Sequence, residues 1–216
     1  MTNKETLIFV EGPSDRLFLG VYLFYLYFQE KFPIKNFKVQ NVDGKNNLSK
    51  RLLEIEKYDK TLIIFDADKN YESNKKEILK VVSKTKQTIS EEQIFLFPNN
   101  QDDGDLEDLL LEIANHKEFI NCFESYLDCI KKKEHYKPIK NIGKNMLYAY
   151  LEALGLEYLY TKKNIFTEGK VKNEYKEDYE RLKKEAINFE SDLLNPLKNF
   201  LRQFAENDQK TNPKIF

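Results

Sequence analysis

Apolar and polar residues follow two different patterns along this chain, and the change comes near its middle. In the first half, short apolar runs are each about as long as a buried strand, and amphipathic stretches separate them. Strands that alternate with helical stretches are typical of a mainly parallel sheet with helices on both faces. The predicted strands are Leu7–Val10, Phe37–Val42, Leu62–Phe65 and Ile94–Phe97.

The stretches between these strands carry apolar residues three and four apart, which predicts amphipathic helices. Gly12 and Pro13 end the first strand, and Ser14 or Asp15 can cap the helix that follows. The predicted helices of this half are Ser14–Glu30, Leu48–Lys57 and Ser73–Ser83.

After Pro98 the pattern becomes almost entirely helical. The predicted helices are Asp105–Asn115, Glu118–Lys131, Met146–Leu154 and Tyr175–Phe204, and one short strand is predicted at Tyr158–Tyr160. We therefore predict an α/β protein in which residues 1–115 form a mainly parallel, four-stranded sheet between helices. Residues 116–216 are predicted to form a C-terminal helical extension that ends in a loose tail.

Composition narrows the class of protein. The chain is 41% hydrophobic with 13 Tyr and 16 Phe, which argues against wholesale disorder, and its net charge of −1 provides no global attraction for nucleic acid. The longest apolar run, Leu17–Phe28, spans only about 18 Å as a helix, against roughly 30 Å of membrane hydrocarbon. No signal peptide is visible, and we expect a soluble protein without membrane contact.

The two cysteines and two histidines favour neither a disulfide nor a zinc site. Cys122 and Cys129 lie seven residues apart in one predicted helix. This separation is roughly 10 Å along the helix, which is too long for a disulfide. His116 and His135 are the only imidazoles, too few for a typical structural zinc site. We expect a reducing, cytoplasmic environment.

Carboxylates follow two of the predicted strands directly. Glu11 follows the first strand, and the third strand runs into "DADKN", which contains Asp66 and Asp68. In an extended chain these two aspartates point the same way, at the sheet edge where α/β proteins bind ligands. If the first and third strands are neighbours, three carboxylates converge there and repel one another. A hard divalent cation, best matched by Mg²⁺, would relieve that repulsion.

The two motifs "FVEGPSD" and "IIFDAD" together resemble the Toprim domain, the catalytic core of topoisomerases, primases and several nucleases. Its signature is Glu-Gly-x-x-Asp after the first strand and Asp-x-Asp after the third, and the matching residues here are Glu11, Gly12, Asp15, Asp66 and Asp68. The resemblance covers about the first 70 residues. It implies a four-stranded, largely parallel sheet with Mg²⁺ or Mn²⁺ held by the aspartates. It also implies that Glu11 is a metal ligand or a general acid–base, and that Asp15 lies close to the metal.

Two later segments are similar to small stand-alone Toprim-like proteins and to overcoming-lysogenization-defect nucleases. The acidic segment "GDLEDLLLEI" contains Glu107, which the resemblance makes a ligand of a second metal, with Asp108 beside it. A plain acidic first turn of a helix would explain Asp108 equally well. Lys144, at a predicted helix start, corresponds to a lysine that stabilises charge in the transition state, and Lys140 is the alternative.

A lysine-rich segment precedes Lys144 and is the clearest basic patch of the chain. It could be a solvated loop, or it could bind the phosphate backbone of a nucleic acid, with Tyr136 available for stacking on a base. The candidate nucleic-acid-binding residues are Lys131, Lys132, Lys133, Lys137 and Lys140.

These features lead to one principal hypothesis and two alternatives. The principal one is a Mg²⁺-dependent nuclease that acts on DNA or, second, RNA. This hypothesis includes a role in phage defence together with an ATPase. That ATPase would be a separate polypeptide, because no phosphate-binding G-x-x-x-x-G-K-[ST] loop occurs here. The first alternative is a non-catalytic Toprim-like partner or regulatory subunit of such an ATPase. The second is a haloacid-dehalogenase-type phosphatase, which is disfavoured because Asn70 stands where that family has Thr or Val.

Overall fold

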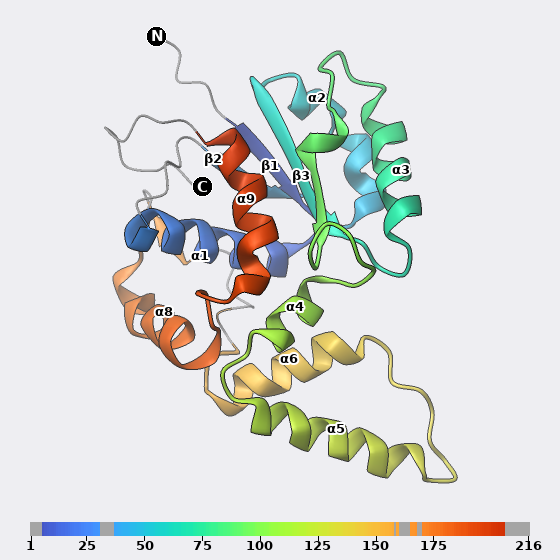
Figure 1. Ribbon diagram of the computed structural model, residues 1–216, viewed down its shortest axis with the longest axis vertical. Coiled ribbons are helices and arrows are strands. Elements are labelled where there is room, and N and C mark those ends of the chain that lie inside the picture. Colours follow the sequence, from blue (N-terminus) through green and yellow to red (C-terminus); the bar gives the residue numbers. More distant parts are fainter. Residues whose placement is uncertain (1–5, 31–36, 158, 160–164, 168–169, 206–216) are drawn as a thin grey trace.

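A computed structural model describes residues 6–30, 37–157, 159, 165–167 and 170–205 of the 216-residue chain. Its centre is a sheet of four parallel strands in the order β2-β1-β3-β4 (Figure 1). These strands are β1 (Thr6–Val10), β2 (Phe37–Asn41), β3 (Lys60–Asp66) and β4 (Ile94–Phe97). The predicted fold class, a parallel four-stranded sheet between helices with further helices after it, is confirmed.

Most side chains of β1, β3 and β4 are buried, which explains their continuous apolar runs, whereas β2 lies at the sheet edge and alternates between apolar and polar residues. Side chains of alternate residues enter two separate hydrophobic clusters, one on each face of the sheet. On one face, Phe9 and Phe65 pack with residues of the short helix α2 (Leu52–Ile55) and of α3 (Tyr71–Val82). This face is therefore covered by the connections from β2 to β3 and from β3 to β4.

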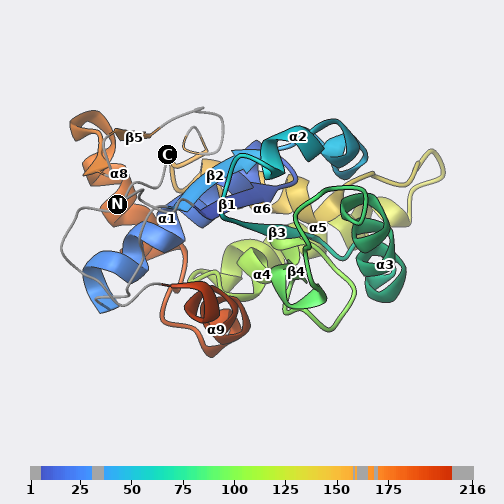
Figure 2. The ribbon, with the colours of Figure 1, turned by 90° about the horizontal axis from the view of Figure 1, so that it is seen from above.

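The other face is covered mainly by α1 (Pro13–Glu30) and by α9 (Asn195–Phe204), which comes from the far end of the chain. Phe200 of α9 packs on Phe95 of β4, with 5.4 Å between ring centroids. Figure 2 shows α9 on one side of the strands and α2 on the other. The C-terminal segment therefore completes the core of the sheet.

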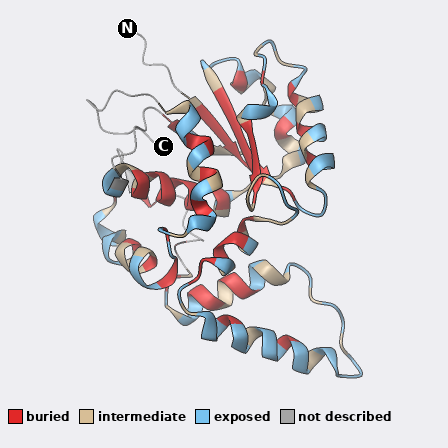
Figure 3. Ribbon diagram, viewed as in Figure 1, coloured by how far each residue is buried: buried red, intermediate tan, exposed pale blue. Residues whose placement is uncertain are grey.

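The remaining helices lie beyond the carboxyl ends of the strands. They are α4 (Leu106–Glu112), α5 (Lys117–Lys131), α6 (Ile142–Ala153) and α8 (Lys176–Arg181). Helices α5 and α6 form a hairpin that projects away from the sheet (Figure 1). Much of the surface of α5 is exposed (Figure 3).

Two predicted helices are interrupted in the structure. The prediction at Leu48–Lys57 is replaced by a 3₁₀ helix at Lys45–Lys50 followed by α2. The long helix predicted at Tyr175–Phe204 was wrong. It is broken after Ala186, where Ile187 forms a β-bridge with Ala114 and the chain turns before α9. Phe189 in this turn is buried against the aromatic rings of α1, so tertiary packing overrides the helical pattern.

The segment between α6 and α8 also differs from its prediction. Two short antiparallel strands, β5 (Phe166–Thr167) and β6 (Lys170–Val171), were not anticipated. The predicted strand at Tyr158–Tyr160 falls mostly outside the described residues, as does the predicted tail. Within the described part of the chain, no helix has both the length and the apolar character needed to cross a membrane.

Candidate metal centre

The carboxyl ends of β1 and β3 create the position at which the site is built. These strands are direct neighbours, with Val10 of β1 paired to Ile64 of β3. The connection that leaves β1 passes over one face of the sheet, and the connection that leaves β3 passes over the other. Such a switch point leaves a crevice beyond the strand ends, where α/β proteins bind ligands. The adjacency on which the sequence prediction depended is therefore present.

A cleft of about 420 Å³ opens at this point. It gathers residues from the turn after β1, from the end of β3, from the start of α4 and from the start of α6. The charged side chains that line it are Glu11, Asp15, Asp66, Asp105, Glu107 and Lys144. Segments separated by more than a hundred residues in sequence thus contribute to one acidic cleft.

Glu11 lies where β1 leaves the sheet, and its carboxylate is only partly satisfied. Oε1 accepts a hydrogen bond from the backbone N–H of Lys45 at 3.4 Å. Oε2 is buried and has no hydrogen-bond partner among the described residues. Burial, and secondarily the charge of Asp68, raises the pKa of Glu11, although the Lys45 N–H and ammonium oppose this shift. Glu11 is thus an acceptor with one oxygen available to a ligand.

Asp15 also has a carboxylate that is only partly satisfied by hydrogen bonds. It lies in the first turn of α1, and its side chain is buried. Its Oδ2 accepts a hydrogen bond from the Gly12 N–H at 3.2 Å, while Oδ1 is buried without a partner in the described part of the chain. Burial raises the pKa of Asp15 to about 7, and the charges of Glu107 and Glu11 add to the effect. The sequence placed Asp15 near the metal only as a supporting residue, but it lines the cleft itself.

Asp66 and Glu107 complete the acidic group. Asp66 ends β3, and its Oδ1 accepts a hydrogen bond from the N–H of Leu106 at the start of α4 at 3.0 Å. The pKa of Asp66 is raised well above its usual value. Burial is the largest cause, and repulsion from Asp15, Glu11 and Glu107 raises the pKa further. Burial also raises the pKa of Glu107, and Asp105 contributes, while Lys144 lowers it.

Asp68 is held differently from Asp66, contrary to the extended-chain expectation. It has a left-handed φ of 52°, so the backbone turns after Ala67 instead of continuing as a strand. Its Oδ2 lies 2.7 Å from the ammonium Nζ of Lys45, which also donates to Asn74 Oδ1 at 2.9 Å. The sequence reasoning missed Lys45. Only its position directly after the predicted second strand, at the same sheet edge, could have suggested it.

The loop after β4 positions α4 through a close backbone contact. Gly104 and Asp68 exchange two backbone hydrogen bonds of 2.7 and 2.8 Å. Gly104 has a φ of +137°, and a Cβ there would approach Asp108 Oδ2 to 2.9 Å. Asp108 and Asp105 form a capping box at the start of α4, with side-chain-to-backbone distances of 2.9 and 3.1 Å. Asp108 therefore orients the helix that carries Glu107.

Lys144 lies in the first turn of α6 and lines the cleft. Asn141 precedes this helix with a left-handed φ of 53°. The lysines of the predicted basic patch lie at the end of α5 and in the exposed connection to α6. Lys131 forms a 3.5 Å ion pair with Asp128 on its own helix. Only Lys144 of the basic residues named from the sequence lines the cleft.

The donor atoms of the cleft match a hard divalent cation. Mg²⁺ and Mn²⁺ prefer carboxylate oxygens, and two of the buried carboxylates here each have an oxygen without a partner. Among the residues that the structure describes, no group of three or more His, Cys, Asp or Glu side chains is already arranged to hold a metal ion. The carboxylate oxygens therefore fit Mg²⁺ or Mn²⁺ chemically. A complete set of ligands would require these carboxylates to move closer together.

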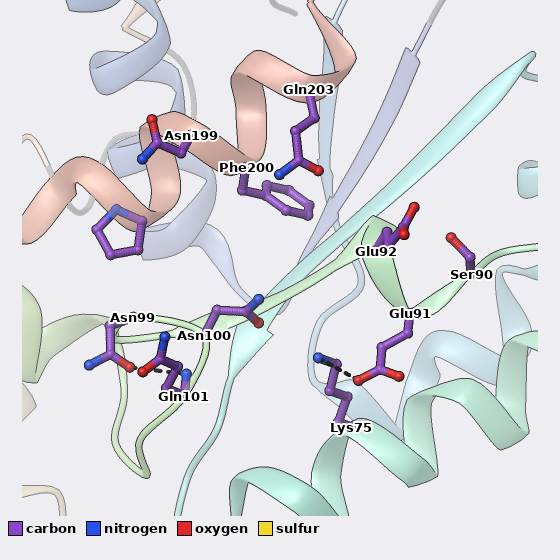
Figure 4. Close-up of a pocket in the computed structure, with 11 residues that line it drawn as sticks. Lys75, Ser90, Glu91, Glu92, Asn99, Asn100, Gln101, Asn199, Phe200 and Gln203 are labelled. Carbon is purple, nitrogen blue, oxygen red and sulfur yellow. Dashed lines mark hydrogen bonds and ion pairs between the residues drawn. The ribbon is translucent and has the colours of Figure 1, made fainter.

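A second cleft, of about 640 Å³, lies beside β4 between α3 and α9 (Figure 4). It contains amide side chains from the loop after β4 and from α9. Asn100 accepts from the N–H of Leu96 at 3.1 Å and donates its own N–H to the Leu96 carbonyl at 2.7 Å. Asn100 thereby satisfies backbone groups on the outer edge of β4. The cleft lacks a cluster of buried carboxylates among its lining residues and is a poorer candidate for metal chemistry.

Comparison with known proteins assigns the chain to a family. The model of the family described as "Protein of unknown function (DUF3226)" matches residues 5–206, which is nearly the whole chain. The chain belongs to this family. No curated protein and no solved structure matches it. The DUF3226 match spans both the sheet and the C-terminal helices, including every element that contributes to the acidic cleft.

Proposed function

We propose that this DUF3226 protein is a Toprim-type hydrolase of phosphodiester bonds that depends on Mg²⁺ or Mn²⁺ and acts on DNA, or alternatively on RNA. One observation carries the proposal. Glu11, Asp15, Asp66 and Glu107 meet in one cleft, where burial and mutual repulsion disfavour their charged forms. Such a group is costly unless a cation binds to it. The Glu-Gly-x-x-Asp and Asp-x-Asp motifs support the same assignment.

In this proposal each carboxylate has a different role. Asp66 and Asp68 would hold one metal ion, Glu107 would hold a second, and Glu11 would bridge them or accept a proton from the attacking water. Bound metal ions would supply electrostatic stabilisation of the attacking and leaving oxygens. The raised pKa makes Glu11 a stronger proton acceptor than an ordinary glutamate. Asp15 supports the group from the turn of α1.

The basic residues would act on the phosphate. Lys144 lies in the cleft, where its ammonium group could neutralise charge on the scissile phosphate. The exposed lysines of the α5–α6 connection would hold the backbone of the nucleic acid without reading its sequence. Because these contacts are electrostatic, we expect binding to weaken as the salt concentration rises.

The test is cleavage of supercoiled plasmid and of single-stranded DNA and RNA in the presence of Mg²⁺ or Mn²⁺. We expect cleavage by the native protein, loss of at least a hundredfold in rate for Asp66→Asn, and no change for Asp59→Asn, an exposed control. Isothermal titration would record metal binding separately. Equal cleavage by the native and Asp66→Asn proteins would refute the assignment.

A non-catalytic role as partner or regulatory subunit of a separate ATPase, in a phage-defence pair, is the second candidate. The observation that favours this role is that, among the described residues, no three carboxylates are arranged closely enough to hold a metal ion. Metal binding without cleavage, followed by activity only when an ATPase encoded beside this protein is added, would support this role over the first.

A further inference from the structure

Lys45 and Asp68 form an ion pair next to the acidic cleft. Lys45 begins the 3₁₀ helix that follows β2, and Asp68 lies just after the end of β3. The Lys45 Nζ is 2.7 Å from Asp68 Oδ2, and the two side chains are 26% and 49% exposed. Of the described residues, those that line the cleft include Asp66 but neither Asp68 nor Lys45. The carboxylate of Asp68 is thus engaged by an internal cation outside the cleft.

Backbone contacts hold both residues of this pair in place. The N–H of Lys45 donates to Glu11 Oε1 at 3.4 Å, and the N–H of Gly44 donates to the Glu11 carbonyl at 2.9 Å. Asp68 and Gly104 exchange two backbone hydrogen bonds. Because the main chain of both loops is anchored beside the cleft, a change of partner at this point requires only the side chains to move.

Asn74 is a second, neutral partner of the same carboxylate. It is buried in α3, and its Nδ2 donates to the Ala67 carbonyl and, at 3.4 Å, to Asp68 Oδ2. Its Oδ1 accepts from Lys45 Nζ at 2.9 Å. A metal ion on Asp68 would repel the ammonium group of Lys45 but not the neutral amide of Asn74. The two partners of Asp68 therefore respond differently to a metal ion.

The chemistry of the site indicates where the ammonium group of Lys45 would go. The carboxylates of Asp68, Glu11 and Glu77 all attract it in the structure. A divalent cation held by Asp68 and Glu11 would cancel much of that attraction. A phosphate bound to the same cation brings a new anion to this side of the cleft, and lysine binds phosphate as a flexible point charge.

We propose that Lys45 exchanges Asp68 for a backbone phosphate of the nucleic-acid substrate, and that this exchange couples substrate binding to metal binding. The inference rests on the proposed function, which supplies the nucleic acid and the metal. Without nucleic acid, Lys45 competes with the metal for Asp68. With nucleic acid, Lys45 has a phosphate partner and the competition ends. By linkage, each ligand then strengthens the binding of the other by the same factor.

The test compares the Mn²⁺ affinities of the native and Lys45→Met proteins by titration calorimetry. Each protein is titrated alone and then with a saturating, short phosphorothioate DNA, which resists cleavage, and the heat of Mn²⁺ binding to the DNA is subtracted. Without DNA we expect Lys45→Met to bind Mn²⁺ about tenfold more tightly, because the competing ion pair is gone. With DNA we expect this advantage to vanish or reverse, because only the native protein gains the phosphate contact.

Two further variants serve as controls. Lys50→Met lies on the same 3₁₀ helix, where Lys50 donates to Asn47, and it should behave as the native protein in both titrations. Lys45→Arg keeps the positive charge and should also follow the native protein. Circular dichroism checks that each variant is folded.

The outcomes separate this inference from the nuclease proposal. A tenfold advantage of Lys45→Met that persists with DNA would show that Lys45 only competes with the metal, and it would overturn the coupling. Equal affinities of the two proteins in both titrations would overturn it as well. If the advantage vanishes with DNA but the native protein does not cleave, the nuclease proposal fails and the coupling stands. Absence of Mn²⁺ binding by the native protein would overturn both.

Discussion

Lys45 places a positive charge directly beside the carboxylates that the sequence assigned to a metal. Its ammonium group lies 2.7 Å from Asp68 Oδ2, while its backbone N–H donates to Glu11. A metal ion bound to Asp68 would compete with this ammonium group, so the side chain of Lys45 opposes metal binding. The backbone N–H contact with Glu11 does not depend on the side chain at position 45.

We therefore expect Lys45→Met to bind Mn²⁺ about tenfold more tightly than the native protein, because Asp68 then loses a competing ion pair of roughly 1 kcal/mol. Titration calorimetry at fixed pH would measure this change. Lys50→Met is the control, because Lys50 is exposed and donates a hydrogen bond to Asn47 Oδ1 at 2.7 Å instead of pairing with Asp68. Weaker Mn²⁺ binding by Lys45→Met would show that Lys45 supports the site.

Asp15 makes stability depend on pH in a direction that follows from its raised pKa. The unfolded chain has an ordinary aspartate with a pKa near 3.8, whereas the folded protein holds the proton up to a pH of about 7. The folded state thus binds more protons, so the free energy of unfolding falls as the pH rises through this window. The raised pKa values of Glu11, Asp66 and Glu107 act in the same direction.

In chelator-containing buffer, Asp15→Asn should be more stable than the native protein at pH 8 by up to about 4 kcal/mol, at about 1.4 kcal/mol per pKa unit. The amide oxygen can still accept from the Gly12 N–H. At pH 4 the difference should nearly vanish. Urea unfolding at both pH values would measure it, and equal stability of the two proteins at pH 8 would contradict the burial argument.

At the scale of elements, the loop between β4 and α4 decides where Glu107 lies. The left-handed φ of Gly104 and its close approach to Asp108 leave no room for a side chain. The backbone pair between Gly104 and Asp68 then ties the loops after β3 and β4 together. One glycine thus fixes the position of α4 relative to the end of β3.

Gly104→Ala should lower the free energy of unfolding by about 2–4 kcal/mol, because the new Cβ would be strained by φ and would meet Asp108 Oδ2 at 2.9 Å. Gly44→Ala is the matched control. Gly44 also has a positive φ, of +98°, but a Cβ there meets nothing within 4 Å, so a loss of only about 1 kcal/mol is expected. Denaturant unfolding of the two variants would compare them, and equal losses would show that backbone strain alone is responsible.

At the scale of the whole molecule, the C-terminal helix α9 is part of the core that covers the sheet. Phe200 is buried and contacts the ring of Phe95 in β4. Ala205 and Phe204 also pack against this cluster from the end of the helix. The sheet and the last described helix should therefore unfold together.

Phe200→Ala should lower the free energy of unfolding by about 3–5 kcal/mol, as removal of a buried aromatic ring does. Gln203→Ala, on the exposed side of the same helix, should change it by less than about 0.5 kcal/mol. Both proteins should unfold in one transition by circular dichroism and by tyrosine fluorescence. Two separate transitions in the native protein would show that α9 and the sheet are independent.

Much of this molecule follows from local sequence. Uniform apolar runs predict three of the four strands, because a parallel sheet buried on both faces needs them, and alternating apolar residues predict the strand at Phe37–Val42. The carboxylates at the ends of the first and third strands were also identified from local patterns, whereas Lys144 was assigned only through the family resemblance. These features depend on periodicity and on neighbours within a few residues, which a sequence displays directly.

Contacts between distant segments decided the rest. The pairing of β1 with β3 brings Glu11 to Asp66, the turn at Asp68 directs its carboxylate to Lys45, and Phe189 breaks the predicted long helix by packing on α1. The raised pKa values exist only because the folded chain removes water from these carboxylates. Local propensities amount to tenths of a kcal/mol per residue, whereas burial of one aromatic ring or one charge amounts to several, so tertiary contacts prevail where the two disagree.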